Sequence, residues 1–190
     1  MLETVKYSNA DKLFFTADTH FGHANIIKYC NRPFSSVEEM DEILIRNWNS
    51  VVPADAIVFH LGDFCLDTKE RWEDIFKRLN GKEKILITGN HDEHKIANGF
   101  DPGFTLVTEQ MLIEIDGQPI LLKHVPLSGL DSNVWQLFGH IHSGPRSSEV
   151  KDPSKLQPIL PNQYDVGVDN NDYRPVSFQE VKKLMVERTI

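Results

Sequence analysis

Five short polar motifs contain the residue types that bind metal ions, and each directly follows an apolar, strand-like run. Together they supply seven oxygen and imidazole donors, the kind of set that holds two divalent cations and activates a water molecule between them. The motifs are, in chain order, Asp18-Thr19-His20, Gly62-Asp63, Gly89-Asn90-His91-Asp92, His124 and Gly139-His140-Ile141-His142. Each motif is weak evidence alone, but the combination predicts a two-metal site.

The first and last motifs each contain two donors separated by one residue. On an extended segment Asp18 and His20 point to the same face, and the same alternation applies to His140 and His142. We expect each pair to contribute to binding one cation. Taken alone, each pair is better explained as a solvated or hydrogen-bonded strand end, so the case for metal rests on the whole set.

The three central motifs also have structural alternatives. Asp63 is either a turn residue after Gly62 or a bridging carboxylate that holds two metals about 3.5–4 Å apart. Asn90 offers a carbonyl oxygen to a hard cation, whereas a Gly-Asn turn with a helix-capping Asp92 explains the same residues. A lone histidine such as His124 is usually not a ligand. The presence of His, Asp or Asn at four separate strand ends favours the metal site.

Short strands alternating with helices must position these motifs. Strands are predicted at 13–17, 56–59 and 84–88, each ending shortly before a motif. Ser36 and Glu39 form a capping-box pattern, and the apolar residues after them repeat as on one side of a helix. A second amphipathic helix is predicted over 72–79, ended by Asn80-Gly81.

The second half of the chain has a different pattern. Asp116-Gly117 separates apolar runs at 111–115 and 119–123, which indicates an antiparallel hairpin. Further strands are predicted at 134–138 and 164–168, with a helix opened by a Ser177–Glu180 capping box. The aperiodic stretch 143–163 is of a length that is usually functional or mobile. We expect an α/β fold, with parallel units first, a hairpin-rich half second, and the motifs at the carboxyl ends of strands.

Length and composition are those of an ordinary globular domain. With 190 residues, 40% apolar and 25% charged, the chain is expected to form a single domain over 1–190. The net charge of −8 disfavours a general polyanion-binding surface, although bound cations can still attract a phosphate. There is no secretory signal pattern and no apolar run of about 20 residues. The lack of a long apolar run predicts no membrane contact. Cys30 and Cys65 are far apart and form no CxxC, which predicts a reduced, cytoplasmic protein.

The five motifs, in this order, resemble the signature of the calcineurin-like metallophosphoesterase superfamily, D-x-H, G-D, G-N-H-[DE], H and G-H-x-H. The resemblance covers the chain from Asp18 to His142 and implies a layered fold of two mixed β-sheets packed together and flanked by helices. The segments 21–27 and 31–34 are similar to those of small bacterial and phage phosphoesterases. One departure is Asp165, where the family pattern has Asn.

The resemblance assigns roles to the motif residues. One metal is held by Asp18, His20, Asp63 and His142. The other is held by Asp63, Asn90, His124 and His140. It also implies that His91 stabilises the transition state or protonates the leaving oxygen, and that Asp92 orients His91. Manganese is the expected metal, and iron, zinc or nickel would suit the same donors.

The function predicted from these roles is hydrolysis of phosphoester bonds. Two metals lower the pKa of a bridging water, and the resulting hydroxide attacks phosphorus in line. His91 favours a phosphodiesterase acting on a small nucleotide-like substrate, because a diester leaving group benefits from a proton donor. The alternatives are a phosphomonoesterase or protein phosphatase, a nuclease, which the charge balance disfavours, and a non-catalytic scaffold.

Several residues near the motifs have less specific patterns. His23 and the two arginines Arg32 and Arg146 are candidate substrate contacts. The alternatives are a surface or hinge histidine and arginines in salt bridges. His60 is interpreted as structural and His94 as solvent-facing. The aromatic residues with core-like periodicity are Trp48, Trp72, Phe76 and Trp135.

Overall fold

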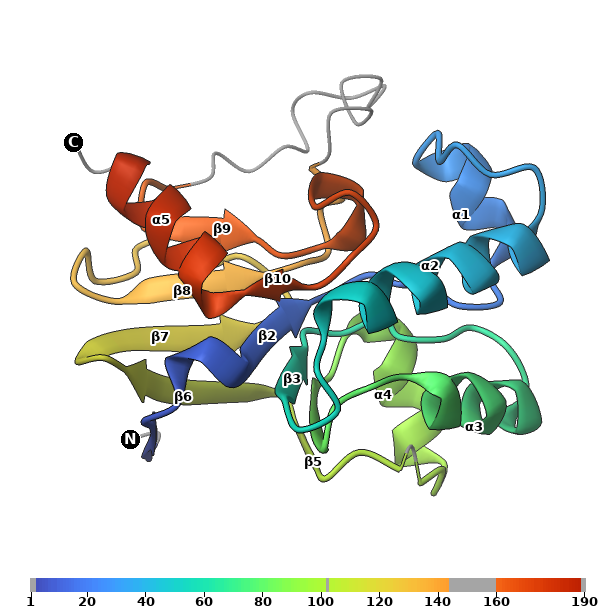
Figure 1. The fold of residues 1–190 in the computed structure, drawn as a ribbon, viewed down its shortest axis with the longest axis horizontal. Helices are drawn as coiled ribbons and strands as arrows, with labels where there is room; N and C mark the ends of the chain where they lie inside the picture. The colour runs from blue at the N-terminus through green and yellow to red at the C-terminus, as the bar shows by residue number, and fades with distance from the viewer. Residues whose placement is uncertain (1–2, 102, 144–159, 189–190) are drawn as a thin grey trace.

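Two five-stranded β-sheets form the centre of the computed structural model, which describes residues 3–101, 103–143 and 160–188 (Figure 1). The first sheet has the order β10-β2-β3-β4-β5. Its strands are β2 (Leu13–Thr16), β3 (Ile57–His60), β4 (Glu83–Ile87), β5 (Leu106–Thr108) and β10 (Val176–Ser177). The second sheet has the order β1-β6-β7-β8-β9. Its strands are β1 (Thr4–Tyr7), β6 (Gln110–Ile115), β7 (Gln118–Lys123), β8 (Trp135–Phe138) and β9 (Gln163–Asp165).

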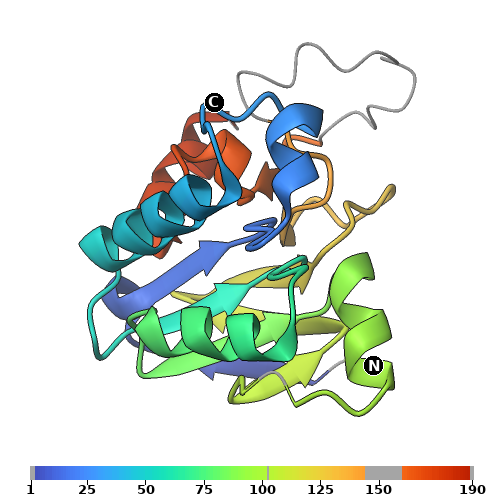
Figure 2. The same cartoon turned by 90° about the vertical axis from the view of Figure 1, so that its right-hand side faces the viewer.

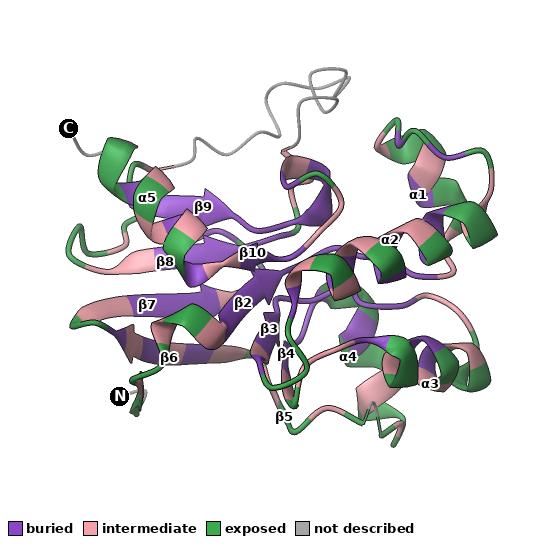
Figure 3. Cartoon of the chain, viewed as in Figure 1, coloured by how far each residue is buried: buried purple, intermediate pink, exposed green. Residues whose placement is uncertain are grey.

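The sheets pack face to face through one apolar core. Phe15 and Phe59 of the first sheet stack with ring centroids 5.2 Å apart and share a buried cluster with Ile113, Ile120 and Leu137 of the second. The inner strands β2, β3, β4 and β8 are accordingly buried along most of their length, whereas the edge strands β1 and β5 are not (Figure 3). This arrangement confirms the predicted α/β fold with two mixed sheets packed together.

Helices flank the sheets. They are α1 (Ala24–Tyr29), α2 (Val37–Val51), α3 (Lys69–Arg78), α4 (Asn90–Ala97) and α5 (Phe178–Arg188). Figure 2 shows α2 and α3 on the outer side of the first sheet, where Trp48 and Trp72 pack with Val58 of β3 in a second cluster. Phe76 and Trp135 are half-buried against the two clusters. The predicted core role of these aromatic residues is therefore confirmed.

The helix starts follow the capping patterns in the sequence. Ser36 Oγ accepts a hydrogen bond from the backbone N–H of Glu39, and the Glu39 carboxylate accepts one from the backbone N–H of Ser35. At α5 the box is reciprocal, because Ser177 Oγ accepts from Glu180 N and the Glu180 carboxylate accepts from Ser177 N. None of the described helices is long and apolar enough to cross a membrane.

The second half of the chain contains fewer antiparallel pairs than predicted. β6 and β7 form the expected hairpin around Asp116-Gly117. However, β7 pairs with β8 in parallel, β8 with β9 in parallel, and β1 with β6 in parallel. The prediction of a hairpin-rich second half was therefore wrong, because the described strands β8 and β9 run parallel to β7 instead of folding back as hairpins. The predicted strand 164–168 is shorter, and a 3-10 turn follows at Val168–Asn170.

Two histidines outside the motifs lie where the sequence suggested. His60 is fully buried, with Nε2 2.9 Å from Thr19 Oγ1 and its ring stacked on Trp48. His94 is exposed on α4. A structural role for His60 and a solvent-facing position for His94 are both confirmed.

Candidate metal centre

The five motifs meet at the carboxyl ends of strands from both sheets. β2, β3 and β4 deliver Asp18, Asp63 and Asn90, and β7 and β8 deliver His124 and the last motif. Backbone hydrogen bonds join the loops directly. Asp18 N donates to Gly62 O at 2.9 Å, and Gly139 N donates to His124 O at 3.0 Å. All seven predicted donors are therefore brought into one region.

The donor pairs converge through left-handed backbone, which corrects the prediction of extended segments. Asp18 and His20 have φ values of 56° and 51°, Asp63 has 58°, and His140 and His142 have 72° and 49°. Non-glycine residues rarely adopt this region, and when they do they cluster at functional sites. The tight turns leave no room for a side chain at Gly89 and Gly139, where a Cβ would clash with the carboxylates of Asp63 and Asp18.

The first donor group consists of Asp18, His20 and His142. One ligand atom of each residue lies within 4.8 Å of the others. Burial raises the pKa of the Asp18 carboxyl and lowers the pKa of the His20 imidazole. Neither ring nitrogen of the buried His20 has a hydrogen-bond partner among the described residues. A cation would supply the missing partner, so these residues fit a metal ion.

The second donor group consists of Asn90, His124 and His140. Asn90 Oδ1 lies 3.2 Å from both His124 Nε2 and His140 Nδ1, which are 3.3 Å from each other. His124 Nδ1 lies 2.7 Å from Leu61 O and donates to it, so in the neutral ring Nε2 carries a lone pair. Burial lowers the pKa of His124 and favours that neutral ring. The lone pair of His124 Nε2 therefore faces the Asn90 carbonyl oxygen. A cation bound between these two atoms would stabilise the arrangement.

Asp63 lies between the two groups. Its Oδ2 atom is 3.6 Å from His20 Nε2 and 3.6 Å from His124 Nε2, while Oδ1 accepts a hydrogen bond from the His91 backbone N–H. The side chain is almost completely buried. This position is the one that a bridging carboxylate requires.

Asp169 is a functional residue to which sequence reasoning gave no role. Its Oδ2 lies 2.7 Å from His142 Nδ1, and its two oxygens accept hydrogen bonds of 2.8 Å from the Arg32 guanidinium. Burial opposes ionisation, but the His142 hydrogen bond and Arg32 lower the Asp169 pKa to about 2. A carboxylate on one imidazole nitrogen orients the ring and leaves the other nitrogen for a metal. The available signal was an acidic residue just after the last predicted strand.

The prediction that Arg32 contacts substrate was wrong, and the salt-bridge alternative is correct. Its side chain is buried and pairs bidentately with Asp169. The guanidinium also donates to Asp18 O at 2.7 Å and Thr19 O at 3.0 Å. Because these bonds face inward, Arg32 holds the first motif loop in place instead of reaching into the cleft.

Asp92 holds backbone groups of the motif loops, and its predicted role in orienting His91 remains a prediction. Its buried carboxylate accepts hydrogen bonds from the backbone N–H groups of Asp63 at 2.7 Å, Phe64 at 3.1 Å and Gly89 at 3.0 Å. Burial raises its pKa to about 6. Asp92 therefore joins the second and third motif loops through their backbone groups.

A cleft of about 320 Å³ opens onto the donors. His91 lies at its edge, with a side chain 42% exposed and Nε2 3.9 Å from Asp63 Oδ2. His23 lines the same cleft, half-buried, with its ring centroid 6.3 Å from that of His91. Contact between His23 and substrate remains a prediction. Arg146 and most of the aperiodic stretch 143–163 lie outside the described residues.

Comparisons with known proteins agree with this geometry. A family model described as calcineurin-like phosphoesterase matches residues 12–175. An uncharacterized protein of Methanocaldococcus jannaschii is 38% identical over 187 residues, covering 94% of this chain and 96% of that protein. The gene 66 protein of Mycobacterium phage L5 is 29% identical over 160 residues, covering 68% of this chain and 77% of that protein.

A solved structure has the same fold. A protein of unknown function from Aquifex aeolicus matches with a TM-score of 0.68 and 28% identity, covering 90% of this chain and 98% of that one. The predicted resemblance is therefore confirmed, and the chain belongs to the calcineurin-like phosphoesterase family.

Proposed function

We propose that this protein is a phosphodiesterase that depends on two divalent metal ions and acts on a small nucleotide-like substrate. The observation that carries the proposal is the position of Asp63 between two groups of imidazole, carboxylate and amide donors whose lone pairs converge. Membership of the calcineurin-like phosphoesterase family supports metal-dependent phosphoester hydrolysis.

The chain offers a complete set of donors for two cations. Asp18, His20 and His142 would hold one, Asn90, His124 and His140 would hold the other, and Asp63 would bind both. Manganese is our first choice, and iron, zinc or nickel suit the same mixture of ligands. When bound, such a pair of cations acidifies a water molecule and neutralises charge on the phosphoryl oxygens.

Protein side chains would supply the remaining parts of the reaction. His91 is exposed at the edge of the cleft, close to Asp63, where it can donate a proton to a leaving oxygen. Such a donor matters most for esters with poorly stabilised leaving groups, which supports a diester substrate. His23, which lines the same cleft, is our candidate for contact with a non-reacting phosphoryl oxygen.

The test is hydrolysis of bis-p-nitrophenyl phosphate and p-nitrophenyl phosphate by one preparation, stripped of metal and refilled with manganese. Faster diester cleavage that requires both manganese and Asp63 is the expected result, with Asp63→Ala as the inactive control. Cleavage of the monoester alone would instead identify a phosphomonoesterase. A protein that binds the metal but turns over neither ester would contradict an enzymatic function with these substrates.

A further inference from the structure

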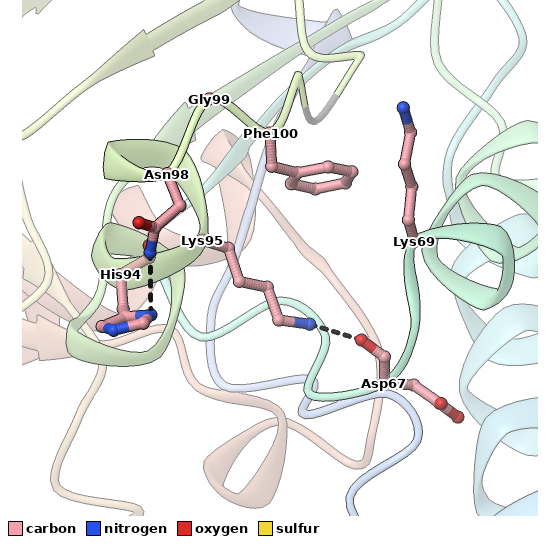
Figure 4. A pocket seen from close by; sticks show the side chains of 7 residues that line it. All are labelled: Asp67, Lys69, His94, Lys95, Asn98, Gly99 and Phe100. Atoms are coloured by element: carbon pink, nitrogen blue, oxygen red, sulfur yellow. Dashed lines mark hydrogen bonds between the residues drawn. The ribbon is translucent and has the colours of Figure 1, made fainter.

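A second hollow lies beside the metal cleft, between the start of α3 and the end of α4. Its volume is about 420 Å³, within the range of roughly 300–1,000 Å³ typical of small-molecule sites. Figure 4 shows the side chains of Lys69, Lys95 and Phe100 around this hollow, with Asp67 at its edge. We call it the α3–α4 pocket.

The α3–α4 pocket adjoins the cleft along two segments of chain. Leu66 lines the cleft, and the next residue, Asp67, lines the pocket. On α4, His91 lines the cleft and Lys95 lines the pocket one turn later. At 1.5 Å per residue, these two positions are about 6 Å apart along the helix. A ligand with a phosphoryl group beside His91 can therefore extend into the pocket.

Phe100 gives the pocket a flat apolar surface. Its ring packs edge-on against Trp72, with centroids 5.0 Å apart and planes at 81°. The Lys69 ammonium lies 6.0 Å from the Phe100 ring centroid. An aromatic face next to a cation is the usual environment for stacking a nucleobase, because every base presents a π-face.

Lys95 places a second positive charge in the α3–α4 pocket. Its ammonium donates to the carbonyl oxygens of Cys65 at 3.2 Å and Asp67 at 2.5 Å, which holds it in position. Over the described ranges, no carboxylate forms an ion pair with Lys95. Its charge is therefore available to a phosphate oxygen or a sugar hydroxyl of a ligand.

We propose that the α3–α4 pocket binds the nucleoside part of a nucleotide ester whose phosphoryl group occupies the metal cleft. The base lies against Phe100 and Lys69, and Lys95 contacts the sugar-phosphate. This assignment rests on the proposed function for the position of the phosphoryl group, and it makes the substrate class a nucleotide instead of any small phosphoester.

Binding to the metal-free protein tests the pocket without using catalysis. Calorimetric titrations in a chelating buffer would compare adenosine 5′-monophosphate with ribose 5-phosphate, which lacks the base. Adenosine 5′-monophosphate is expected to bind at least about fivefold more tightly, the low end for one stacked base. Phe100→Leu should remove this preference, while Lys183→Met, which changes an exposed lysine on α5, should preserve it.

Lys69→Met is a second variant, because Phe100→Leu also alters packing against Trp72. It should weaken adenosine 5′-monophosphate binding at least twofold and leave ribose 5-phosphate binding unchanged. Equal affinities for the two ligands in the wild type, undetectable nucleotide binding, or a preference that survives both variants would overturn the proposal.

The same variants separate this proposal from the proposed function. Bis-p-nitrophenyl phosphate carries no nucleoside, so the manganese-loaded Phe100→Leu protein should cleave it within twofold of the wild-type rate. If the wild type cleaves neither test ester, the proposed function fails while the binding result still decides the pocket. If the esters are cleaved but the base gives no gain in binding, only the nucleoside assignment fails.

Discussion

The Nδ1 atom of His142 lies 2.7 Å from Oδ2 of Asp169, and this hydrogen bond joins the candidate metal centre to the protein core. Asp169 is itself held by the two hydrogen bonds from Arg32. Arg32 also donates to the backbone oxygens of Asp18 and Thr19. One buried arginine therefore positions both a histidine of the last motif and the loop of the first.

Asp169→Asn should weaken metal binding while leaving the fold intact. The amide is nearly the same size, but it can present an N–H to His142 Nδ1 and favour the wrong tautomer of the imidazole. Loss of such a partner typically lowers metal affinity about 10–100-fold. Competition with a chromophoric chelator would measure the change, with Asp172→Asn, an exposed residue three positions later, as the control. Unchanged affinity in Asp169→Asn would contradict a positioning role.

Arg32→Lys should destabilise the protein much more than the same change at an exposed arginine. A lysine cannot reproduce the bidentate pair, so Asp169 would lose a partner while remaining buried. The lysine keeps the positive charge but loses a hydrogen bond to a buried carboxylate, which costs about 1.5–3 kcal/mol in the free energy of unfolding. Urea unfolding of the metal-free protein would measure it.

Arg78→Lys is the matched control for Arg32→Lys. Arg78 pairs with Glu42 at the surface, where both side chains are substantially exposed. Disrupting an ion pair at such an exposed site lowers the free energy of unfolding by at most about 1 kcal/mol. Equal losses in the two variants would show that the Arg32–Asp169 pair has no special importance for the fold.

The sequence indicated which candidate metal donors would meet, but not which residues support them. Each donor directly follows a short apolar strand, so the motif order alone indicated that they would meet at strand ends. Asp169 and Arg32 are far apart in sequence and meet only because Val168 pairs its backbone with Ala17. That contact depends on the parallel return of β9, which the aperiodic stretch before it did not reveal.

The backbone conformation of the donor residues could also not be predicted from the periodicity of the sequence. The alternation rule placed Asp18 and His20 on one face of a strand, but β2 ends at Thr16 and both residues adopt left-handed φ. They converge with His142 all the same, because hydrogen bonds to the neighbouring Gly62-Asp63 loop fix the turn. Asp18 and His20 therefore do converge as predicted, but through a left-handed turn and not through alternation along a strand.

His91→Ala should reduce cleavage of esters with poor leaving groups more than cleavage of activated esters. A nucleoside leaving oxygen needs a proton, whereas p-nitrophenolate leaves readily without one. For a diester with a nucleoside leaving group, kcat/KM is expected to fall about 10²–10⁴-fold. The loss for bis-p-nitrophenyl phosphate should be at least tenfold smaller, with metal content checked in both proteins. Similar losses for the two diesters would exclude His91 as the proton donor.

His60 should make the metal-free protein less stable in acid. Burial, followed by the influence of His124, lowers its pKa from 6.5 to about 3, so the folded protein keeps it neutral at pH 5.5. The unfolded chain takes up a proton below pH 6.5 that the folded chain does not. Stability from this group is therefore complete above pH 6.5 and is lost as the pH falls toward the folded pKa.

Between pH 7 and pH 5.5, His60 is expected to lower the free energy of unfolding by about 1.3 kcal/mol. Over that interval, this histidine takes up a proton only in the unfolded state. His60→Gln can retain a hydrogen bond to Thr19 Oγ1 but cannot titrate. Over the same pH interval, the free energy of unfolding of this variant should therefore fall by about 1.3 kcal/mol less than that of the wild type. Urea unfolding at both pH values, in chelator, measures the difference. His94→Gln, which changes a solvent-exposed histidine on α4, should lose as much stability as the wild type. If His60→Gln and the wild type lose equal stability, the proton is taken up elsewhere, and the buried imidazole does not account for acid sensitivity.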